Sequence, residues 1–215
     1  MTAALANRGF TVEAIDHSQA MIDLTRKLAS NRAIENRVKA NVGDVHHLSY
    51  GNQSFDLIVA LGVIPWLHDA QKALTEITRV LRTNGYIILT MDNALRATTL
   101  LDPLTFPAIA KIQRWGRRKL QRAGLLISWN PWINAPPYTQ HSIKEFNHDL
   151  RVAGLKLLKS NSIGFGPFTF FRHRLFSEQV GIKILLKLQE YADSGYPILR
   201  STGSQYIVLA KKEGK

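Results

Sequence analysis

Acidic residues end two strand-like runs near the start of the chain. Asp16 closes the run that begins at Phe10, and Asp44 follows a short apolar stretch at residues 38–42. A carboxylate at the carboxyl end of a strand in an open α/β sheet can accept hydrogen bonds from both ribose hydroxyls of an adenosine-containing cofactor. Because aspartate also caps helices, Asp16 alone favours neither role. The second acidic strand end, in Gly43-Asp44-Val45, is harder to explain as a cap and indicates a nucleoside-binding edge.

One histidine stands where it could move a proton. His68 follows Trp66-Leu67, just beyond a third apolar run at residues 55–61. Histidine is the commonest general base near neutral pH. Its position beside Asp69, a residue type that caps helices, favours a structural role at a helix start as the alternative. The seven histidines have no metal-ligand spacing, so we expect no metal site. The lack of cysteine excludes disulfides and thiolate nucleophiles.

The apolar patterning predicts strands that alternate with helices. Strands are expected at residues 11–16, 38–42, 55–61 and 86–91. Between the first two, the apolar residues of one helical stripe are Met21, Ile22, Leu24 and Leu28. Between the last two, a second helix is marked by Leu74, Ile77, Val80 and Leu81. This alternation predicts βαβ units and a mostly parallel sheet with right-handed crossovers.

The alternation stops after Asp92 and returns near the end of the chain. Ser142-Ile143-Lys144-Glu145 has the spacing of a capping box, so a helix is expected to start there. A short strand at 155–158 and a last strand at 205–210 follow. The two intervening stretches, before residue 141 and between 162 and 203, are interpreted as insertions.

The ordered series of motifs resembles a known family. The acidic strand end at Asp16, the Gly43-Asp44-Val45 turn, the strand at 55–61 and the helix-turn-strand at 79–90 follow one another as in class I S-adenosylmethionine-dependent methyltransferases of the type 11-like group. That family usually has a proline and two glycines in the last turn, where this chain has Thr83, Asn84 and one glycine. Asparagine tolerates left-handed backbone angles, so the turn is expected to form.

The resemblance implies S-adenosylmethionine as cofactor and gives some residues a role. Asp16 and His17 would lie at the ribose, while Asp44 and Val45 would lie at the adenine. Leu61 would follow the next strand, where backbone faces the cofactor, although plain core packing explains Leu61 equally well. No metal is implied, and His68 is the candidate catalytic base.

The resemblance also implies a fold and a departure from it. The family's first strand and its Gly-x-Gly-x-Gly loop would be expected before residue 1, and that strand normally lies between the strands at 11–16 and 55–61. The predicted fold class is therefore α/β, a Rossmann-like, mostly parallel, doubly wound sheet that is N-terminally truncated. Insertions are expected after the fifth strand of the family and before the last one. The expected segments are a truncated cofactor-binding core at 1–92, a basic insertion or lid at 93–140, a core helix and strand at 141–161, an aromatic-basic insertion at 162–203, and the last strand with a basic tail at 204–215.

Charge is unevenly spread along the chain. The net charge is +12, yet residues 1–95 hold nine basic and nine acidic residues, so the excess belongs to residues 96–215. Helical spacing within 109–122 aligns Lys111, Arg114, Arg118 and Arg122. This stripe predicts a solvated surface, an anionic membrane contact or a site for a phosphate-bearing substrate. Residues 164–174 combine phenylalanines with cations, which favours either a substrate-pocket wall or simple core packing.

These observations define the functional expectations. The leading one is methyl transfer to a small-molecule or lipid-like acceptor, impaired by the truncation. The alternatives are an RNA methyltransferase, motivated by the basic charge, and a catalytically silent partner subunit. No RNA-binding module is recognisable, which disfavours nucleic acid. No apolar run reaches the length of a bilayer span, so a cytoplasmic protein with optional peripheral contact to an anionic membrane is expected. The sequence leaves the oligomeric state open.

Overall fold

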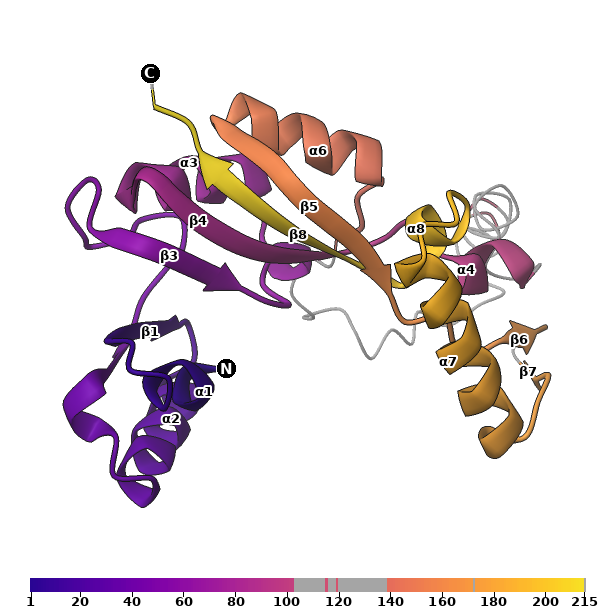
Figure 1. Cartoon of the computed structure of the whole chain (residues 1–215), viewed down its shortest axis with the longest axis horizontal. Coiled ribbons are helices and arrows are strands. Elements are labelled where there is room, and N and C mark those ends of the chain that lie inside the picture. Colours follow the sequence, from indigo (N-terminus) through magenta and orange to yellow (C-terminus); the bar gives the residue numbers. More distant parts are fainter. Residues whose placement is uncertain (103–114, 116–118, 120–138, 172, 215) are drawn as a thin grey trace.

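The described strands form three sheets: a two-stranded one at the amino terminus, a larger four-stranded one, and a second, short two-stranded one. A computed structural model describes residues 1–102, 115, 119, 139–171 and 173–214. Figure 1 shows a small unit at the amino terminus, a larger four-stranded sheet beside it, and a helical group at the far end of that sheet. The predicted stripe of Lys111, Arg114, Arg118 and Arg122 lies outside the described residues.

The amino-terminal unit is a single βαβ element preceded by a short helix. Its elements are α1 (Thr2–Ala6), β1 (Val12–Asp16), α2 (Gln19–Asn31), the 3₁₀ turn η1 (Glu35–Arg37) and β2 (Val38–Val42). β1 and β2 pair in parallel, with Val12 opposite Val38 and Asp16 opposite Val42. The buried cluster of this unit is small and consists of Ala3, Ala6, Ala29 and Ile34.

The larger sheet has the strand order β3-β4-β8-β5. Its strands are β3 (Phe55–Ala60), β4 (Leu81–Asp92), β5 (Leu155–Ile163) and β8 (Gln205–Lys212). β3 and β4 are parallel, whereas β8 runs antiparallel to both β4 and β5. The predicted α/β class with a Rossmann-like arrangement is confirmed, and the antiparallel strand β8 is the last strand that the sequence predicted. Among the described strands, β1 pairs with β2 alone and β3 with β4 alone, so the two sheets are not joined by hydrogen bonds.

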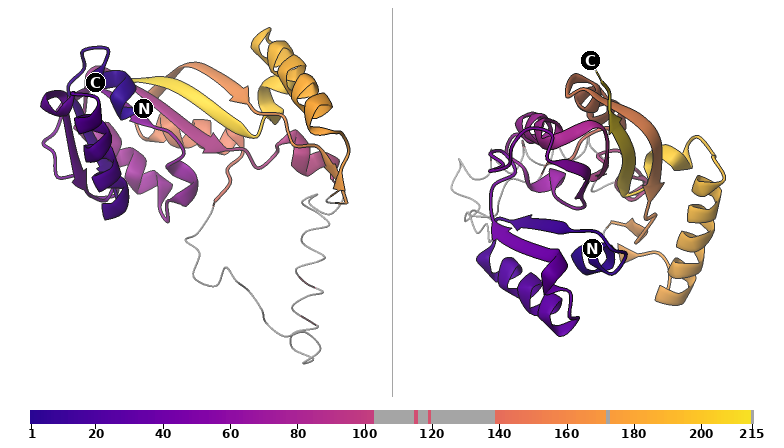
Figure 2. Two further views of the ribbon diagram at one scale, coloured as in Figure 1. Left: turned by 90° about the horizontal axis from the view of Figure 1, so that it is seen from below. Right: turned by 60° about the vertical axis from the view of Figure 1, so that its left-hand side comes forward.

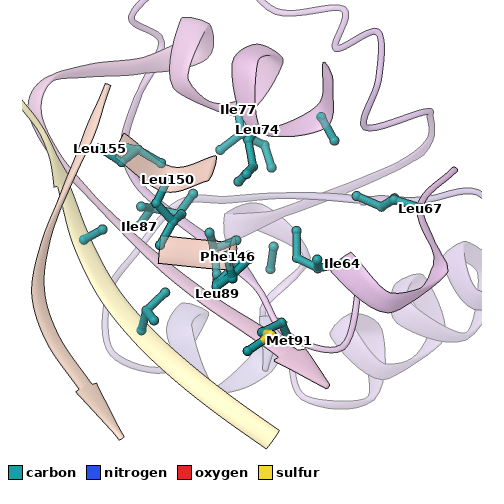
Figure 3. Close-up of a cluster of buried hydrophobic side chains, with 14 of the residues drawn as sticks. Ile64, Leu67, Leu74, Ile77, Ile87, Leu89, Met91, Phe146, Leu150 and Leu155 are labelled. Atoms are coloured by element: carbon teal, nitrogen blue, oxygen red, sulfur yellow. The ribbon is translucent and has the colours of Figure 1, made fainter. Parts of the chain in front are cut away.

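Helices α3 (Ala70–Val80) and α6 (Ile143–Val152) cover one face of the larger sheet. Figure 3 shows side chains of both helices meeting those of β4. The fully buried residues labelled there include Leu74, Ile77, Ile87, Leu89, Phe146 and Leu150. This stacking of apolar helix stripes on a sheet is the main source of burial in the described chain. The predicted capping box is present at the start of α6, where Ser142 and Glu145 bond each other's backbone N–H groups.

The carboxyl-terminal helical group lies at the end of the larger sheet away from the amino-terminal unit (Figure 2). Its elements are α4 (Ala97–Leu101), the two-residue strands β6 (Thr169–Phe170) and β7 (His173–Arg174), α7 (Glu178–Asp193) and α8 (Leu199–Thr202). The segment 162–203, predicted as an insertion, contains the helix α7, which the apolar pattern did not predict. None of the helices in the described ranges combines the length and the apolarity that a bilayer span requires.

Several boundaries differ from the sequence expectation. α3 ends at Val80, and Leu81 starts β4, because residues 82–85 form an irregularity between the pairs Phe55–Leu81 and Leu57–Tyr86. Asn84 has φ +66°, so the left-handed conformation expected at this turn is confirmed. β5 runs on to Ile163, past the predicted end at 158.

The helix stripe predicted for α2 is only partly buried. Ile22 is buried, whereas Met21, Leu24 and Leu28 are 48%, 57% and 39% exposed. The amino-terminal unit therefore offers its own helix a small apolar surface to pack on.

Candidate functional site

The two acidic strand ends lie at one edge of the amino-terminal sheet. Asp16 ends β1, and Gly43 N–H donates a hydrogen bond of 3.1 Å to the Asp16 carbonyl oxygen, which fixes the start of the turn that carries Asp44. Because β1 and β2 are neighbouring parallel strands, both aspartates occupy the carboxyl edge. Asp16 also accepts a hydrogen bond of 2.8 Å from the Ser18 N–H at the start of α2. The Asp16 side chain therefore also has a structural role, in the turn between β1 and α2.

Asp44 is held by the histidine two residues later. Its Oδ1 accepts the His46 backbone N–H at 2.9 Å and the His46 Nδ1–H at 2.6 Å. These bonds, the backbone one first, lower the pKa of the Asp44 carboxyl below its ordinary value. The carboxylate side chain is 50% exposed, while the His46 side chain is 5% exposed. An ionised, accessible acceptor is thus anchored on a buried ring.

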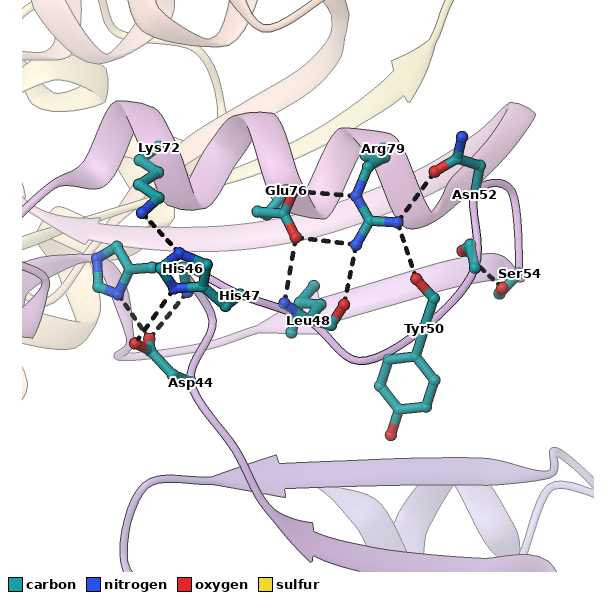
Figure 4. Close-up of polar contacts among 11 residues, drawn as sticks. Asp44, His46, His47, Leu48, Tyr50, Asn52, Ser54, Lys72, Glu76 and Arg79 are labelled. Atoms are coloured by element: carbon teal, nitrogen blue, oxygen red, sulfur yellow. Dashed lines mark hydrogen bonds and ion pairs between the residues drawn. The ribbon is translucent and has the colours of Figure 1, made fainter.

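The imidazole of His46 belongs to a group of polar side chains between β2 and α3. Its ring lies on that of His68, with centroids 3.9 Å apart and planes tilted by 32°. His47 lies on the other side, with Nδ1 at 4.0 Å from Asp44 Oδ2 and Nε2 at 2.9 Å from Lys72 Nζ. Figure 4 shows Asp44, both vicinal histidines and Lys72 along one side of the loop. His68 therefore contacts His46, and His46 in turn bonds the Asp44 side chain.

The loop that carries these residues is fastened to α3 (Figure 4). Arg79 donates to the carbonyl oxygens of Leu48 and Tyr50 at 2.9 and 2.8 Å, and Glu76 accepts the Leu48 N–H at 3.1 Å. Arg79 and Glu76 also bond each other at 2.9 Å. The Arg79 hydrogen bond is the main cause that lowers the pKa of Glu76 to about 2. The same loop lines a cavity of about 540 Å³ whose walls are His46, His47, Leu48, Ser49, Lys72, Thr75 and Glu76.

The other predicted residues are distributed between the two sheets. Val45 is half-buried and packs against the larger core rather than lying free at the edge. Leu61 follows β3, in the other sheet, and is 39% exposed. The next residue, Gly62, has φ +70° and donates its N–H to Thr90 Oγ1 at 2.7 Å, which anchors the turn after β3. His17 is exposed beyond β1.

Sequence reasoning missed His46, His47 and Lys72. The signal was present, because two consecutive histidines, His46 and His47, follow Asp44 after a single valine, but no ligand spacing marked them. Within the described ranges, no group of three histidine, aspartate or glutamate side chains is arranged to hold a metal ion. His46 and His47 instead make hydrogen bonds, to Asp44 and to Lys72 respectively. Of the phenylalanines in the aromatic-basic segment, Phe165 is buried, while Phe170 and Phe171 are about half exposed.

Comparison with known proteins places the amino-terminal part of the chain. Residues 1–89 match the model of a family described as a methyltransferase domain. Demethylmenaquinone methyltransferase of Lactobacillus johnsonii is 32% identical to this chain over 90 residues. That match covers 40% of this chain and 37% of the relative, so the chain spans well under two thirds of that protein's length in the alignment.

Solved structures extend the likeness to the whole fold. An S-adenosylmethionine-dependent methyltransferase from Methanosarcina mazei has a TM-score of 0.60 at 14% identity, with 100% of this chain and 88% of that chain covered. A putative methyltransferase of Haloferax volcanii, solved in complex with the Trm112 methyltransferase activator, has a TM-score of 0.59 at 16% identity and covers 99% of this chain and 77% of that chain. At these identities the likeness concerns the fold alone.

Proposed function

We propose that this chain, whose residues 1–89 belong to the S-adenosylmethionine-dependent methyltransferases, takes part in methyl transfer to a small-molecule or lipid-like acceptor. The observation that carries the proposal is the pair of aspartates at the carboxyl edge of β1 and β2. There Asp16 would accept the ribose hydroxyls, with His17 beside it, and Asp44 the adenine amino group. The backbone at Val45, whose side chain packs on the larger core, and the backbone at Leu61 would border the adenosine.

The residues present fit this cofactor. An adenosine offers hydrogen-bond donors at its ribose and at its amino group, and both aspartates are acceptors when ionised. The lowered pKa of Asp44 keeps that carboxyl ionised at neutral pH. The cofactor, when bound, supplies an electrophilic methyl group, so the protein's share is to bind, orient and, for a protonated acceptor, remove a proton.

We retain His68 as the candidate base for that proton. Its ring stacks on His46 at 3.9 Å, close to the carboxylate of Asp44. A neutral imidazole is the form that accepts a proton.

The acceptor class is supported by one relative and by exposed apolar surface. The named substrate of the Lactobacillus johnsonii relative is a demethylmenaquinone. In this chain, Phe170 and Phe171 are about half exposed on the β6–β7 segment, and Ile182 and Leu186 are exposed on α7. An apolar acceptor could lie against these side chains. Lys183 and Lys187 on α7 would also suit peripheral contact with an anionic membrane.

Calorimetric titration with S-adenosylhomocysteine tests the proposal. We expect binding by the wild-type chain and binding weakened about tenfold by Asp44→Asn, because a charged acceptor is replaced by a neutral amide. Asp149→Asn on α6 serves as the matched control. No binding by the wild-type chain, or equal binding by Asp44→Asn, contradicts the proposal.

A second candidate function is that of a catalytically silent partner subunit. It is favoured by the two described sheets that share no strand pairing, since β1 and β3 could pair with a strand of another chain. The Haloferax volcanii relative was solved with a separate activator protein. Cofactor binding by this chain alone would count against this candidate. The RNA methyltransferase alternative rests on the basic charge and on the predicted stripe from Lys111 to Arg122, which lies outside the described residues.

A further inference from the structure

His46 is buried, yet one of its ring nitrogens has no described partner. The residue is 4% exposed, and Nε2 is a buried atom without a hydrogen bond to any described group. Nδ1 lies at 2.6 Å from Asp44 Oδ1. A buried polar atom left alone carries a desolvation penalty, which is larger for an N–H than for a bare lone pair beside a second ring.

This arrangement determines which nitrogen carries the proton. Because an ionised Asp44 can only accept, Nδ1 is the donor, and the partnerless Nε2 favours the Nδ1–H tautomer over the Nε2–H tautomer. His46 thus donates two bonds, one from the ring and one from the backbone, to the same oxygen of Asp44. Two bonds to one oxygen fix the carboxylate plane.

The other carboxylate oxygen is left for a ligand. The His47 Nδ1 atom lies at 4.0 Å from Asp44 Oδ2, which exceeds hydrogen-bond distance. The Asp44 side chain is 50% exposed, so solvent or a ligand can reach it. Asp44 Oδ2 is thus oriented and has no close donor. It can accept a hydrogen bond from an N–H group of a ligand, whereas a ligand carbonyl oxygen at the same position would be repelled.

We infer that His46 is a positioning residue, which aligns Asp44 so that Oδ2 recognises the 6-amino group of an adenine ring. The inference rests on the proposed function and deepens it, because it assigns the choice of nucleobase to a side chain outside the aspartate itself. The His68 ring, whose centroid lies 3.9 Å from that of His46, and the bonds from Arg79 to the loop backbone keep the imidazole in place.

Two substitutions separate hydrogen bonding from packing. His46→Asn places an amide N–H near the position of Nδ1, whereas His46→Gln places its amide near Nε2. Both remove the ring that stacks on His68, so they lose the same packing. His148→Asn and His148→Gln, at an exposed position of α6, are the matched controls.

The measurement is calorimetric titration with S-adenosylhomocysteine and with its analogue in which hydrogen replaces the 6-amino group. We expect His46→Gln to weaken S-adenosylhomocysteine binding about tenfold, as the loss of one charge-assisted bond predicts, and to change analogue binding less than about twofold. His46→Asn is expected to stay within about threefold of wild type for both ligands.

The outcomes distinguish the two proposals. Equal losses in the two His46 variants, or equal losses for the two ligands, would overturn the positioning role while leaving cofactor binding intact. Failure of the wild-type chain to bind either ligand would overturn the proposed function and the inference with it. The ring tautomer gives a ligand-free readout: nitrogen NMR of His46 should show the neutral Nδ1–H form, and an Nε2–H form contradicts the inference.

Discussion

The amino-terminal unit and the four-stranded sheet differ most in how they are buried. The core of the larger sheet contains fully buried leucine, isoleucine and phenylalanine side chains from β4, α3 and α6, whereas the amino-terminal cluster is three alanines and Ile34. Burial free energy scales with apolar area, so stability is concentrated in the larger sheet. Of the proposed cofactor carboxylates, Asp16 lies on the less stable unit, whereas Asp44 begins the loop of residues 44–54 that joins this unit to the stable one.

This contrast teaches that binding and stability are carried by different parts of the chain. The least stable elements are where proteins commonly move or order on binding. Here the connection is polar: Glu76 and Arg79 of α3 hold the backbone of the loop that contains His46. A ligand bound at Asp16 and Asp44 is therefore expected to stabilise the amino-terminal unit more than the larger sheet.

The largest expected effect comes from truncating the larger core. Leu74 is fully buried between α3 and the sheet, and Leu74→Ala should lower the free energy of unfolding by about 3 kcal/mol through a cavity. Ile34→Ala, in the alanine cluster and 8% exposed, should lower it by about 2 kcal/mol or less. Urea denaturation followed by circular dichroism measures both. A larger effect at Ile34 would reverse the comparison.

The second effect concerns binding rather than stability. Asp44→Asn should weaken S-adenosylhomocysteine binding about tenfold and change the unfolding midpoint little, because the side chain is half exposed. Leu74→Ala should lower the unfolding midpoint but, at temperatures where the variant is folded, leave S-adenosylhomocysteine binding nearly unchanged. Calorimetry and urea denaturation on the same two variants would reveal whether the two roles separate. Joint loss of binding and stability in Asp44→Asn would show that they do not.

Helix caps extend the comparison to the ends of helices. Ser142 accepts the Glu145 N–H and completes a capping box on α6, whereas Ser18 makes no side-chain cap bond on α2. Ser142→Ala is expected to lower the free energy of unfolding by about 1 kcal/mol. Ser18→Ala should change it by less than about 0.5 kcal/mol. Thermal denaturation of the pair checks this, and an equal shift would mean that Ser18 acts as a cap in solution.

Sequence patterns predicted the strands well because each signal was local. The apolar run at 55–61, the acidic ends at Asp16 and Asp44, and the capping box at Ser142 depend on neighbours in sequence. The turn at Asn84 was predicted for the same reason. The end of α3 was misplaced by one residue, since Leu81 is apolar both as a last helical residue and as the first residue of a strand.

The candidate site was predicted only in part, because its remaining members meet through tertiary contacts. Nothing in the sequence indicated that His46 would turn back on Asp44 and stack on His68, 22 positions later. Lys72 reaches His47 from a different element. The exposure of the apolar stripe of α2 could not be predicted for the same reason. Helical spacing shows which side chains share a face, but not how much apolar surface the fold offers them to pack on.

A change in stability with pH tests the connection between the two regions. The pKa of Glu76 is lowered from its ordinary 4.5 to about 2, chiefly by the Arg79 hydrogen bond. A carboxyl with a depressed folded pKa adds stability that is present above its unfolded pKa and is lost as the pH falls through the folded value. The contribution of Glu76 should therefore be complete above about pH 4.5 and decline toward pH 2.

Comparing urea denaturation of wild type and Glu76→Gln across that window isolates this contribution: the difference in the free energy of unfolding between them should shrink as the pH falls. Glu178→Gln, in the first turn of α7, offers a control away from the loop. A difference that stays constant with pH would show that the Glu76 carboxylate does not help to fasten the site loop to α3.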